Sequence, residues 1–270
     1  MSVEVVAEIG GSHGGDMDNA LKLIMAAKAS GADSIKMQCF SPLRLATARG
    51  FGEFQGRPLL DIYEETYTDP RWFVEMINLA VGFDLQWFSS AFDPMDVEFL
   101  ESMDCPRYKI SSFDVNNHPL IDSIRQTGKP AILSTGMATD VEINRAVCFM
   151  ISPAQPHPTV LHCVSGYPTP RHEANIRRIK HLRDMLPLTF KIGFSDHTLS
   201  TVIPAAAVAL GAEMIEKHIK LDDVETVDSS FSLPPREFWQ MVINIREVES
   251  AMQHGVAHSE ESSRPYRVVK

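Results

Sequence analysis

The chain is poor in cysteine, has no excess of positive charge and lacks a long apolar run. Each lack excludes a class of protein. The four cysteines in 270 residues form no C-x-x-C pair, so their spacing indicates neither a zinc site nor a disulfide framework. They are Cys39, Cys105, Cys148 and Cys163. The remaining interpretation is a set of reduced thiols in a cytoplasmic protein.

The N-terminus and the charge balance exclude two further classes. The first fifteen residues lack a basic stretch followed by an apolar core, and no apolar run has membrane-spanning length, so we predict neither a signal peptide nor a membrane span. With 25 basic against 35 acidic residues, the formal net charge is −10, which is not typical of nucleic-acid binding. The expected partners are therefore small molecules, and an anionic substrate would need local Lys or Arg side chains.

Short apolar segments recur at the spacing of repeated strand–helix units. They are rich in Ile, Val and Phe and almost continuously apolar, as buried parallel strands are. We predict strands at 3–10, 34–40, 85–92, 107–112, 131–136, 159–165, 190–197 and 214–219. Helix start signals lie between them, such as Asp93-Pro94 and the capping-box spacing of Thr139 and Glu142. Eight repeats predict a single-domain (β/α)8 TIM barrel over 1–253, with a doubly wound open sheet as the alternative.

Two segments do not follow this repeat. Residues 41–68 are far longer than an ordinary connection from a strand to a helix. Because such connections lie at the catalytic face of a (β/α)8 barrel, we interpret this segment as a lid or an acceptor-site wall, with a decorative insertion as the alternative. The polar stretch 254–270 lacks periodicity and is interpreted as a C-terminal tail.

Polar side chains are predicted where the strands end, at the C-terminal mouth of the barrel. Lys36 and Lys109 are the two lysines among them. The set also includes Glu8, Gln38, Ser90, Ser112, Ser134 and Ser195. Two lysines with several hydroxyls suit a small, multiply charged anion that carries phosphate or carboxylate. An ion pair of Lys36 with Glu8 is the structural alternative.

Two histidines, His197 and His218, close the last two predicted strands. Imidazoles from adjacent strands suit a divalent metal whose other positions go to water and substrate, with hydrogen-bonded structural histidines as the alternative. Glu216 shares a strand face with His218, so it is a candidate third ligand or an orienting partner. Lys217 then faces the helical layer, where we expect it to be ion-paired.

An ordered set of motifs runs through the chain between residues 4 and 252. They are AEIGGSHGG, IKMQCF, FSSAFD, YKISSFD, GKPAILSTGMAT, LHCVSGYPTP, GFSDHT, ALGAEMIEKHI and DSSFSL. In this order the chain resembles the sialic acid synthases, enzymes that condense phosphoenolpyruvate with an amino-sugar aldehyde. LLDIYEETYTDP, the Phe of ISSFD, and DSSFSL are most similar to the pseudaminic acid synthase branch. The resemblance implies a synthase that makes a nonulosonic or other 2-keto-3-deoxy acid and releases phosphate.

Residue roles follow from the resemblance position by position. It implies phosphoenolpyruvate binding by Lys36, Gln38, Ser90, Lys109, Ser112, Ser134, Ser195 and His197, acceptor binding by Asp114, Tyr167 and Asp228, and metal binding by His197 and His218. The implied catalytic residues are Glu8, Lys36, Lys109 and His197, with Glu8 as the candidate for handling a proton. The implied cofactor is a divalent metal that polarises the aldehyde, Mn²⁺ first, with Mg²⁺ or Co²⁺ as alternatives. A homodimer is the implied assembly.

The chain departs from the family pattern in ways that concern the acceptor half of the site. Ser12 replaces the usual Asn, and Asp114 stands where the family commonly has Glu. The C-terminal antifreeze-like domain, which in the family supplies an arginine to a partner's acceptor site, has no counterpart in this sequence, and 254–270 resembles the start of the linker to it. Two other functions therefore stay open, a barrel aldolase or lyase acting on a small anion and a non-catalytic sugar- or anion-binding barrel.

Overall fold

Eight parallel strands close into a barrel in the computed structural model of the chain, which describes residues 2–54, 56–151 and 156–252. In their order around the barrel they are β1 (Glu4–Glu8), β10 (Met214–His218), β9 (Lys191–Asp196), β8 (Thr159–Cys163), β7 (Ala131–Ser134), β6 (Tyr108–Ile110), β5 (Gln86–Ala91) and β2 (Ser34–Cys39). Each lies within one predicted segment, so the predicted (β/α)8 barrel is confirmed and the open sheet is excluded. The predicted tail, 254–270, lies outside the described residues.

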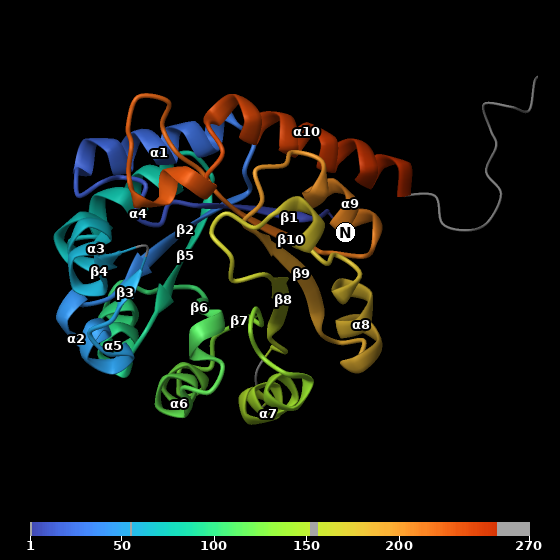
Figure 1. Cartoon of the computed structure of the whole chain (residues 1–270), viewed down its shortest axis with the longest axis horizontal. Coiled ribbons are helices and arrows are strands. Elements are labelled where there is room, and N and C mark those ends of the chain that lie inside the picture. Colours follow the sequence, from blue (N-terminus) through green and yellow to red (C-terminus); the bar gives the residue numbers. More distant parts are fainter. Residues whose placement is uncertain (1, 55, 152–155, 253–270) are drawn as a thin grey trace, which may run out of the picture.

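Helices surround the barrel on its outside (Figure 1). They are α1 (Met17–Ala29), α4 (Phe73–Gly82), α5 (Pro94–Ser102), α6 (His118–Gln126), α7 (Asp140–Met150), α8 (Arg178–Met185), α9 (Ile203–Ala209) and α10 (Pro235–Met252). Thr139 forms the predicted capping box at the start of α7, and Asp93, predicted as an N-cap, also forms a capping box at the start of α5. No helix among the described residues is both long and apolar enough to cross a membrane.

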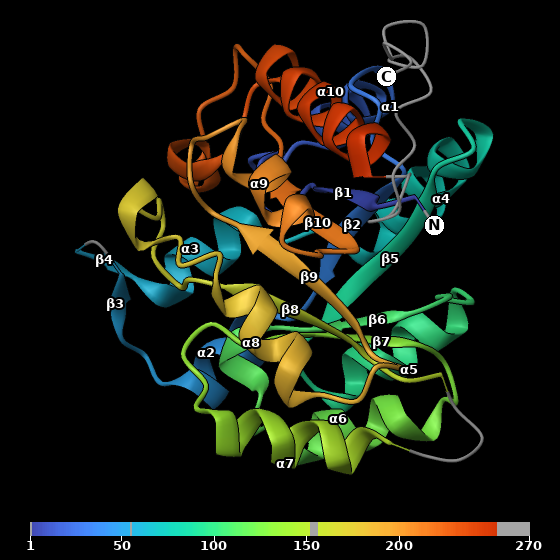
Figure 2. The ribbon, with the colours of Figure 1, turned by 90° about the vertical axis from the view of Figure 1, so that its right-hand side faces the viewer.

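The long segment 41–68 folds into elements of its own. It contains α2 (Pro42–Arg49), a two-stranded hairpin of β3 (Glu53–Phe54) and β4 (Arg57–Pro58), and α3 (Leu59–Thr66). Figure 2 shows this hairpin on the side of the barrel toward which β9 points, away from the N-terminus. The insertion is therefore part of the C-terminal mouth, as expected for a wall of a site there.

Four short 3-10 helices complete the part of the chain that the structure describes. They are η1 (Pro70–Trp72), η2 (Ser112–Asp114), η3 (Arg171–Glu173) and η4 (Val227–Phe231). The connections after β6 and β10 contain η2 and η4, so both lie at the C-terminal mouth. They carry two of the predicted acceptor residues, Asp114 and Asp228.

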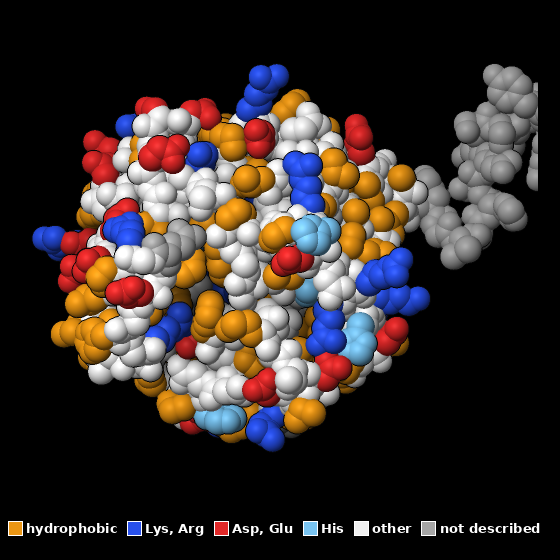
Figure 3. Space-filling view, in the orientation of Figure 1, with side chains coloured by type: hydrophobic (Ala, Val, Ile, Leu, Met, Phe, Trp, Pro, Cys, Tyr) orange, Lys and Arg blue, Asp and Glu red, His pale blue; other side chains and the backbone are white. Residues whose placement is uncertain are grey.

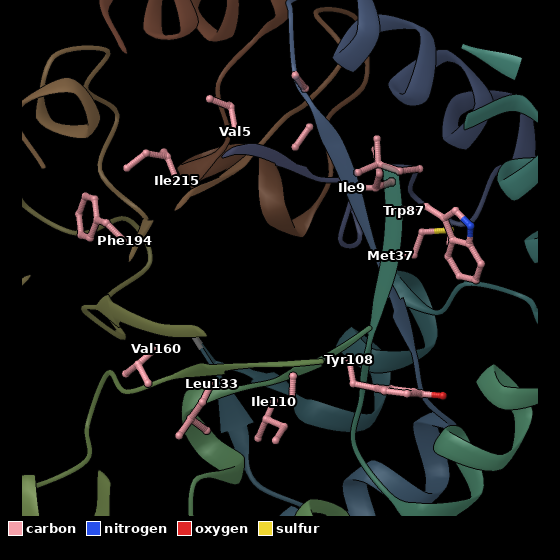
Figure 4. Close-up of a cluster of buried hydrophobic side chains, with 14 of the residues drawn as sticks. Val5, Ile9, Met37, Trp87, Tyr108, Ile110, Leu133, Val160, Phe194 and Ile215 are labelled. Carbon is pink, nitrogen blue, oxygen red and sulfur yellow. The ribbon is translucent and has the colours of Figure 1, made fainter. Parts of the chain in front are cut away.

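Alternation along the strands divides their side chains between two environments. The labelled side chains in Figure 4, such as Val5, Phe194 and Ile215, point outward and pack with the helices in the main core. A smaller cluster fills the barrel below the mouth and comprises Val6, Phe88, Ile132, Leu161 and Met214. Because successive strand residues face opposite ways, the inward positions above this plug receive the polar strand-end residues.

Gly193 lets the strands β8, β9 and β10 approach within the barrel. A Cβ at this position would lie 2.5 Å from the Met214 carbonyl oxygen and 2.6 Å from Leu161 Cδ2. We expect Gly193→Ala to lower the free energy of unfolding by about 1–3 kcal/mol through overpacking, measured by urea denaturation. Gly82→Ala is the control, because a Cβ at Gly82 meets nothing within 4 Å, and its stability should be unchanged or slightly raised. Equal stability of both variants would contradict the prediction.

Candidate active site at the mouth of the barrel

Two lysines and two glutamates meet inside the barrel, above the apolar plug. Lys36 Nζ lies 2.6 Å from Glu8 Oε2 and 3.2 Å from Glu216 Oε2. Lys109 Nζ lies 3.6 Å from Glu216 Oε1. The register places Glu8 beside Lys36 on neighbouring strands, and all four side chains are buried. The predicted gathering of the lysines is confirmed, and so is the alternative ion pair of Lys36 with Glu8.

Burial and opposite charge act against each other in this cluster. Burial lowers the pKa of Lys36 to about 7, although the Glu216 carboxylate opposes the shift. Burial would raise the pKa of Glu216, but the nearby charges of Lys109 and Lys36 outweigh it and hold that pKa below its usual value. The cluster thus contains one carboxylate between two lysines, and burial makes Lys36 easier to deprotonate than an exposed lysine.

Amide and hydroxyl groups extend the cluster. Gln38 Nε2 donates to Glu8 Oε1 over 3.1 Å, and Ser195 Oγ donates to Glu216 Oε1 over 2.9 Å. Ser90 is buried on β5, where the register sets it beside Gln38 on one side and Lys109 on the other. These predicted residues therefore lie together at one level of the barrel.

A second group of small polar side chains lies beyond the ends of β6, β7 and β8. Ser112 Oγ accepts a hydrogen bond from Gly136 N–H over 3.1 Å and lies 2.9 Å from Cys163 Sγ. Ser134 Oγ and Ser165 Oγ are buried, and neither has a hydrogen-bond partner among the described residues. Unpaired buried hydroxyls carry a desolvation cost that a bound ligand would relieve.

Gly136 leaves the space in which the hydroxyls of Ser112 and Ser165 come together. A Cβ at this position would lie 2.2 Å from Ser165 Oγ and 2.9 Å from Ser112 Oγ. Only glycine therefore leaves room for both hydroxyls at this position. The two hydroxyls then lie where they could donate hydrogen bonds to an anion.

The two histidines predicted as metal ligands lie next to each other at the ends of the adjacent strands β9 and β10, with ring centroids 5.9 Å apart. His197 Nδ1 lies 2.8 Å from the Val164 carbonyl oxygen, so Nδ1 carries the proton and Nε2 keeps its lone pair. Burial lowers the pKa of His197 to about 3, which keeps the imidazole neutral. Neutral imidazoles with free Nε2 atoms are the form in which histidine binds metals, so this residue fits the predicted role.

His218 has an acidic neighbour that the predictions had assigned to the acceptor. Asp228 Oδ2 lies 3.5 Å from His218 Nδ1 and accepts a hydrogen bond of 2.8 Å from Gly11 N–H. A Cβ at Gly10, whose φ is +49°, would lie 2.5 Å from the same Asp228 oxygen. The glycine turn after β1 thus holds Asp228 where it can orient His218 as well as contact a ligand.

Glu216 does not take the role proposed for it beside His218. It shares a strand face with His218, as predicted, but its carboxylate contacts Lys36, Lys109 and Ser195. Two buried ammonium groups attract the Glu216 carboxylate, which lies against them rather than against His218. Among the described residues, no three His, Cys, Asp or Glu side chains form a metal-binding group, so the chain offers two histidines for a metal.

Aromatic rings and one arginine border the mouth above these groups. The ring centroids of Tyr167 and His197 are 4.2 Å apart, and those of His218 and Phe231 are 4.9 Å apart. Asp114 Oδ2 accepts a hydrogen bond of 2.7 Å from Arg49 Nη2. Space-filling Figure 3 shows this face, on which hydrophobic side chains and Lys or Arg side chains border a hollow.

Sequence reasoning missed two residues of this arrangement, Cys163 and Arg49. Cys163 is the last residue of β8, where inward alternation from Leu161 could have identified it. Arg49 lies in the insertion, and its only signal was that the insertion was expected at the catalytic face.

Comparison with known proteins agrees with the geometry. Pseudaminic acid synthase from Campylobacter jejuni subsp. jejuni serotype O:23/36 (strain 81-176) is 36% identical over 98% of this chain and 79% of its own length. N-acetylneuraminate-9-phosphate synthase of Mus musculus is 33% identical over 92% of this chain and 70% of its own. The crystal structure of N-acetylneuraminic acid synthetase from Leptospira borgpetersenii serovar Hardjo-bovis, in complex with citrate, superposes with a TM-score of 0.89 at 30% identity, over 98% of this chain and 90% of that one. The model of the NeuB family matches residues 23–257, and the chain belongs to this family.

Proposed function

We propose that this chain is a synthase that condenses phosphoenolpyruvate with an amino-sugar aldose in a metal-dependent reaction, giving a nonulosonic acid and phosphate. A bond forms between C3 of phosphoenolpyruvate and the aldehyde carbon, whose oxygen becomes a hydroxyl. Water adds at C2, and the C2–O bond to phosphate breaks, which leaves the 2-keto acid. The observation that carries the proposal is that two buried lysines, unpaired buried hydroxyls and two neighbouring histidines gather at the same mouth of the barrel.

The lysine and hydroxyl groups support the binding of a small polyanion. Lys36 and Lys109 carry the positive charge, and Ser112, Ser134 and Ser195 would supply hydroxyl groups from neighbouring strand ends. Phosphoenolpyruvate bears phosphate and carboxylate groups, so it would take contacts from both sets. The Leptospira relative was crystallised with citrate, which is also a small polyanion.

His197 and His218 would hold the metal, and Asp228 would orient His218. When bound, a divalent metal would supply Lewis acidity to the aldehyde oxygen. Tyr167, against His197, would form one wall for the sugar. Glu8 is fully buried and ion-paired with Lys36, which places a carboxylate beside the anion for holding a proton of the attacking water or of the acceptor.

Phosphate release tests the proposal. Purified protein would be incubated with phosphoenolpyruvate, a panel of aldoses (hexosamines, 6-deoxy-diamino sugars and simple aldoses), and Mn²⁺, Mg²⁺ or Co²⁺. We expect release only when an aldose and a metal are both present, with loss of release on adding EDTA and recovery with excess metal. Mass spectrometry should find a 2-keto acid with the combined carbon count.

Two results would contradict parts of the proposal. Absence of phosphate release across the whole panel would favour an aldolase, a lyase or a binding protein. Release that survives EDTA and prior dialysis would mean that the histidine pair does not act through a metal.

A further inference from the structure

Arg49 reaches from the insertion after β2 to the connection after β6, two strands away around the barrel. It is the last residue of α2, and its Nη2 donates to Asp114 Oδ2 over 2.7 Å and to Ser111 Oγ over 3.3 Å. Asp114 is buried, and its other oxygen, Oδ1, lies 3.4 Å from Asn117 Nδ2. Protein donors thus engage both oxygens of Asp114. The guanidinium of Arg49 is therefore the group of this ion pair that can still bind a ligand at the mouth.

Two aromatic rings fix the plane of this guanidinium. Its Cζ lies 5.4 Å from the ring centroid of Phe92 and 5.1 Å from that of Phe113. The Phe113 residue is 52% exposed, so an apolar surface adjoins the arginine at the rim. An arginine held by a carboxylate and two rings loses little further freedom when a ligand binds.

The guanidinium keeps hydrogen-bonding capacity. Both hydrogen bonds of Arg49 use Nη2, while Nε and Nη1 have no partner among the described residues. The side chain is 23% exposed. Ser111 and Asp114, which hold Nη2, lie in the connection after β6, so the unused donors lie at the C-terminal mouth of the barrel.

Resting on the proposed function, we propose that Arg49 and Phe113 form the subsite for an acylamino substituent of the acceptor sugar. The acyl carbonyl oxygen accepts a hydrogen bond from Arg49 Nε or Nη1, and the acyl methyl group packs on the ring of Phe113. Arg49 is thus a specificity-determining residue that the insertion 41–68 contributes to the site.

The charges at the subsite favour this neutral group over charged ones. Asp114 already neutralises Arg49, so a carboxylate or phosphate on the sugar would gain little and would be repelled by Asp114. A free ammonium group is a cation and a hydrogen-bond donor like the guanidinium, so the two would repel each other and form no hydrogen bond. The subsite therefore distinguishes an acylated amino sugar from its free amine.

The test compares Arg49→Met with Arg44→Met. Arg44 lies on the same helix and is also ion-paired, but with Asp93 and Asp96. Saturation-transfer NMR on 2-acetamido hexoses and 2,4-diacetamido-6-deoxy hexoses reports contact of the acetyl methyl group. These samples contain diamagnetic Mg²⁺ instead of Mn²⁺ and no phosphoenolpyruvate, so that turnover does not consume the aldose. Phosphate release gives KM for acetylated and free-amine aldoses and for phosphoenolpyruvate.

We expect Arg49→Met to lose the methyl signal and to raise KM for the acetylated aldose about 10- to 100-fold, the loss typical of a hydrogen bond to a charged donor. KM for the free-amine aldose and for phosphoenolpyruvate should change less than about 3-fold. Arg44→Met should leave every KM within about 3-fold of the parent value, although it should lower stability because its partner Asp96 is buried.

The outcomes separate this inference from the proposed function. Phosphate release with equal KM for acetylated and free-amine aldoses, or an undiminished methyl signal in a folded Arg49→Met variant, would overturn the subsite while the synthase function stands. A methyl signal that depends on Arg49 in a protein that releases no phosphate would support the subsite and overturn the synthase function. Absence of a methyl signal from the parent protein with every acetylated aldose would overturn the subsite.

Discussion

Replacement of His218 by alanine is expected to lower the affinity for Mn²⁺ by more than about 100-fold and to lower phosphate release in parallel. The described residues offer only His197 and His218 as clustered imidazole ligands, so removing one leaves a single protein ligand. Loss of an orienting partner typically costs 10- to 100-fold in metal affinity, and loss of the ligand itself should cost more. Electron paramagnetic resonance of Mn²⁺ measures the binding independently of turnover.

Asp228→Asn provides the graded comparison. It keeps the imidazole but weakens the contact at His218 Nδ1, so Mn²⁺ affinity should fall about 10- to 100-fold, less than in His218→Ala. His181→Ala is the control, because this exposed histidine pairs with Asp140 on the outer surface. If His218→Ala binds Mn²⁺ as tightly as the control, the ligand assignment is wrong. If binding is lost while phosphate release persists, the proposed metal dependence is wrong.

The strands and helices of the barrel were predictable because their signals lie within short stretches of sequence. Strands buried on both faces need continuously apolar sequences, and helix caps such as Asp93 and Thr139 have short-range signatures. The closure of eight parallel strands then fixes which ends meet. That rule predicted that Lys36, Lys109 and Ser195 lie close together, and the structure places all three around the Glu216 carboxylate.

The partners within the site were less predictable than its location. Alternation correctly put Glu216 and His218 on one face, but it could not decide whether the carboxylate would turn to an imidazole or to two ammonium groups. Arg49 was missed because the path of an insertion is not set by the barrel's repeat. Its position follows from contacts between α2 and the η2 connection, which are distant in sequence.

Lys217 and Asp196 provide the prediction with the largest expected effect on stability. Lys217 Nζ donates to Asp196 Oδ2 over 2.7 Å and also to the Thr198 carbonyl oxygen, and both charged side chains are inaccessible to solvent. Burial lowers the pKa of Lys217, and Asp196 opposes this shift. The expected ion pair of Lys217 is thus present. Lys217→Met should lower the free energy of unfolding by about 3–5 kcal/mol, measured by urea denaturation, because Asp196 would remain buried without a counter-charge.

The double variant Lys217→Met/Asp196→Asn distinguishes two causes of lost stability, an unpaired buried carboxylate and the loss of the hydrogen bonds that Lys217 makes. If the stranded carboxylate causes the damage, the double variant should be more stable than Lys217→Met alone, whereas additive losses would contradict this cause. Lys220→Met is the control, because Lys220 pairs at 3.5 Å with the exposed Glu225 and should change stability by no more than about 1 kcal/mol. Asp196 also accepts hydrogen bonds from the backbone N–H and hydroxyl of Thr198, which immediately follows His197. A double variant with recovered stability but weakened Mn²⁺ binding would therefore mean that the ion pair chiefly positions His197 at the end of β9.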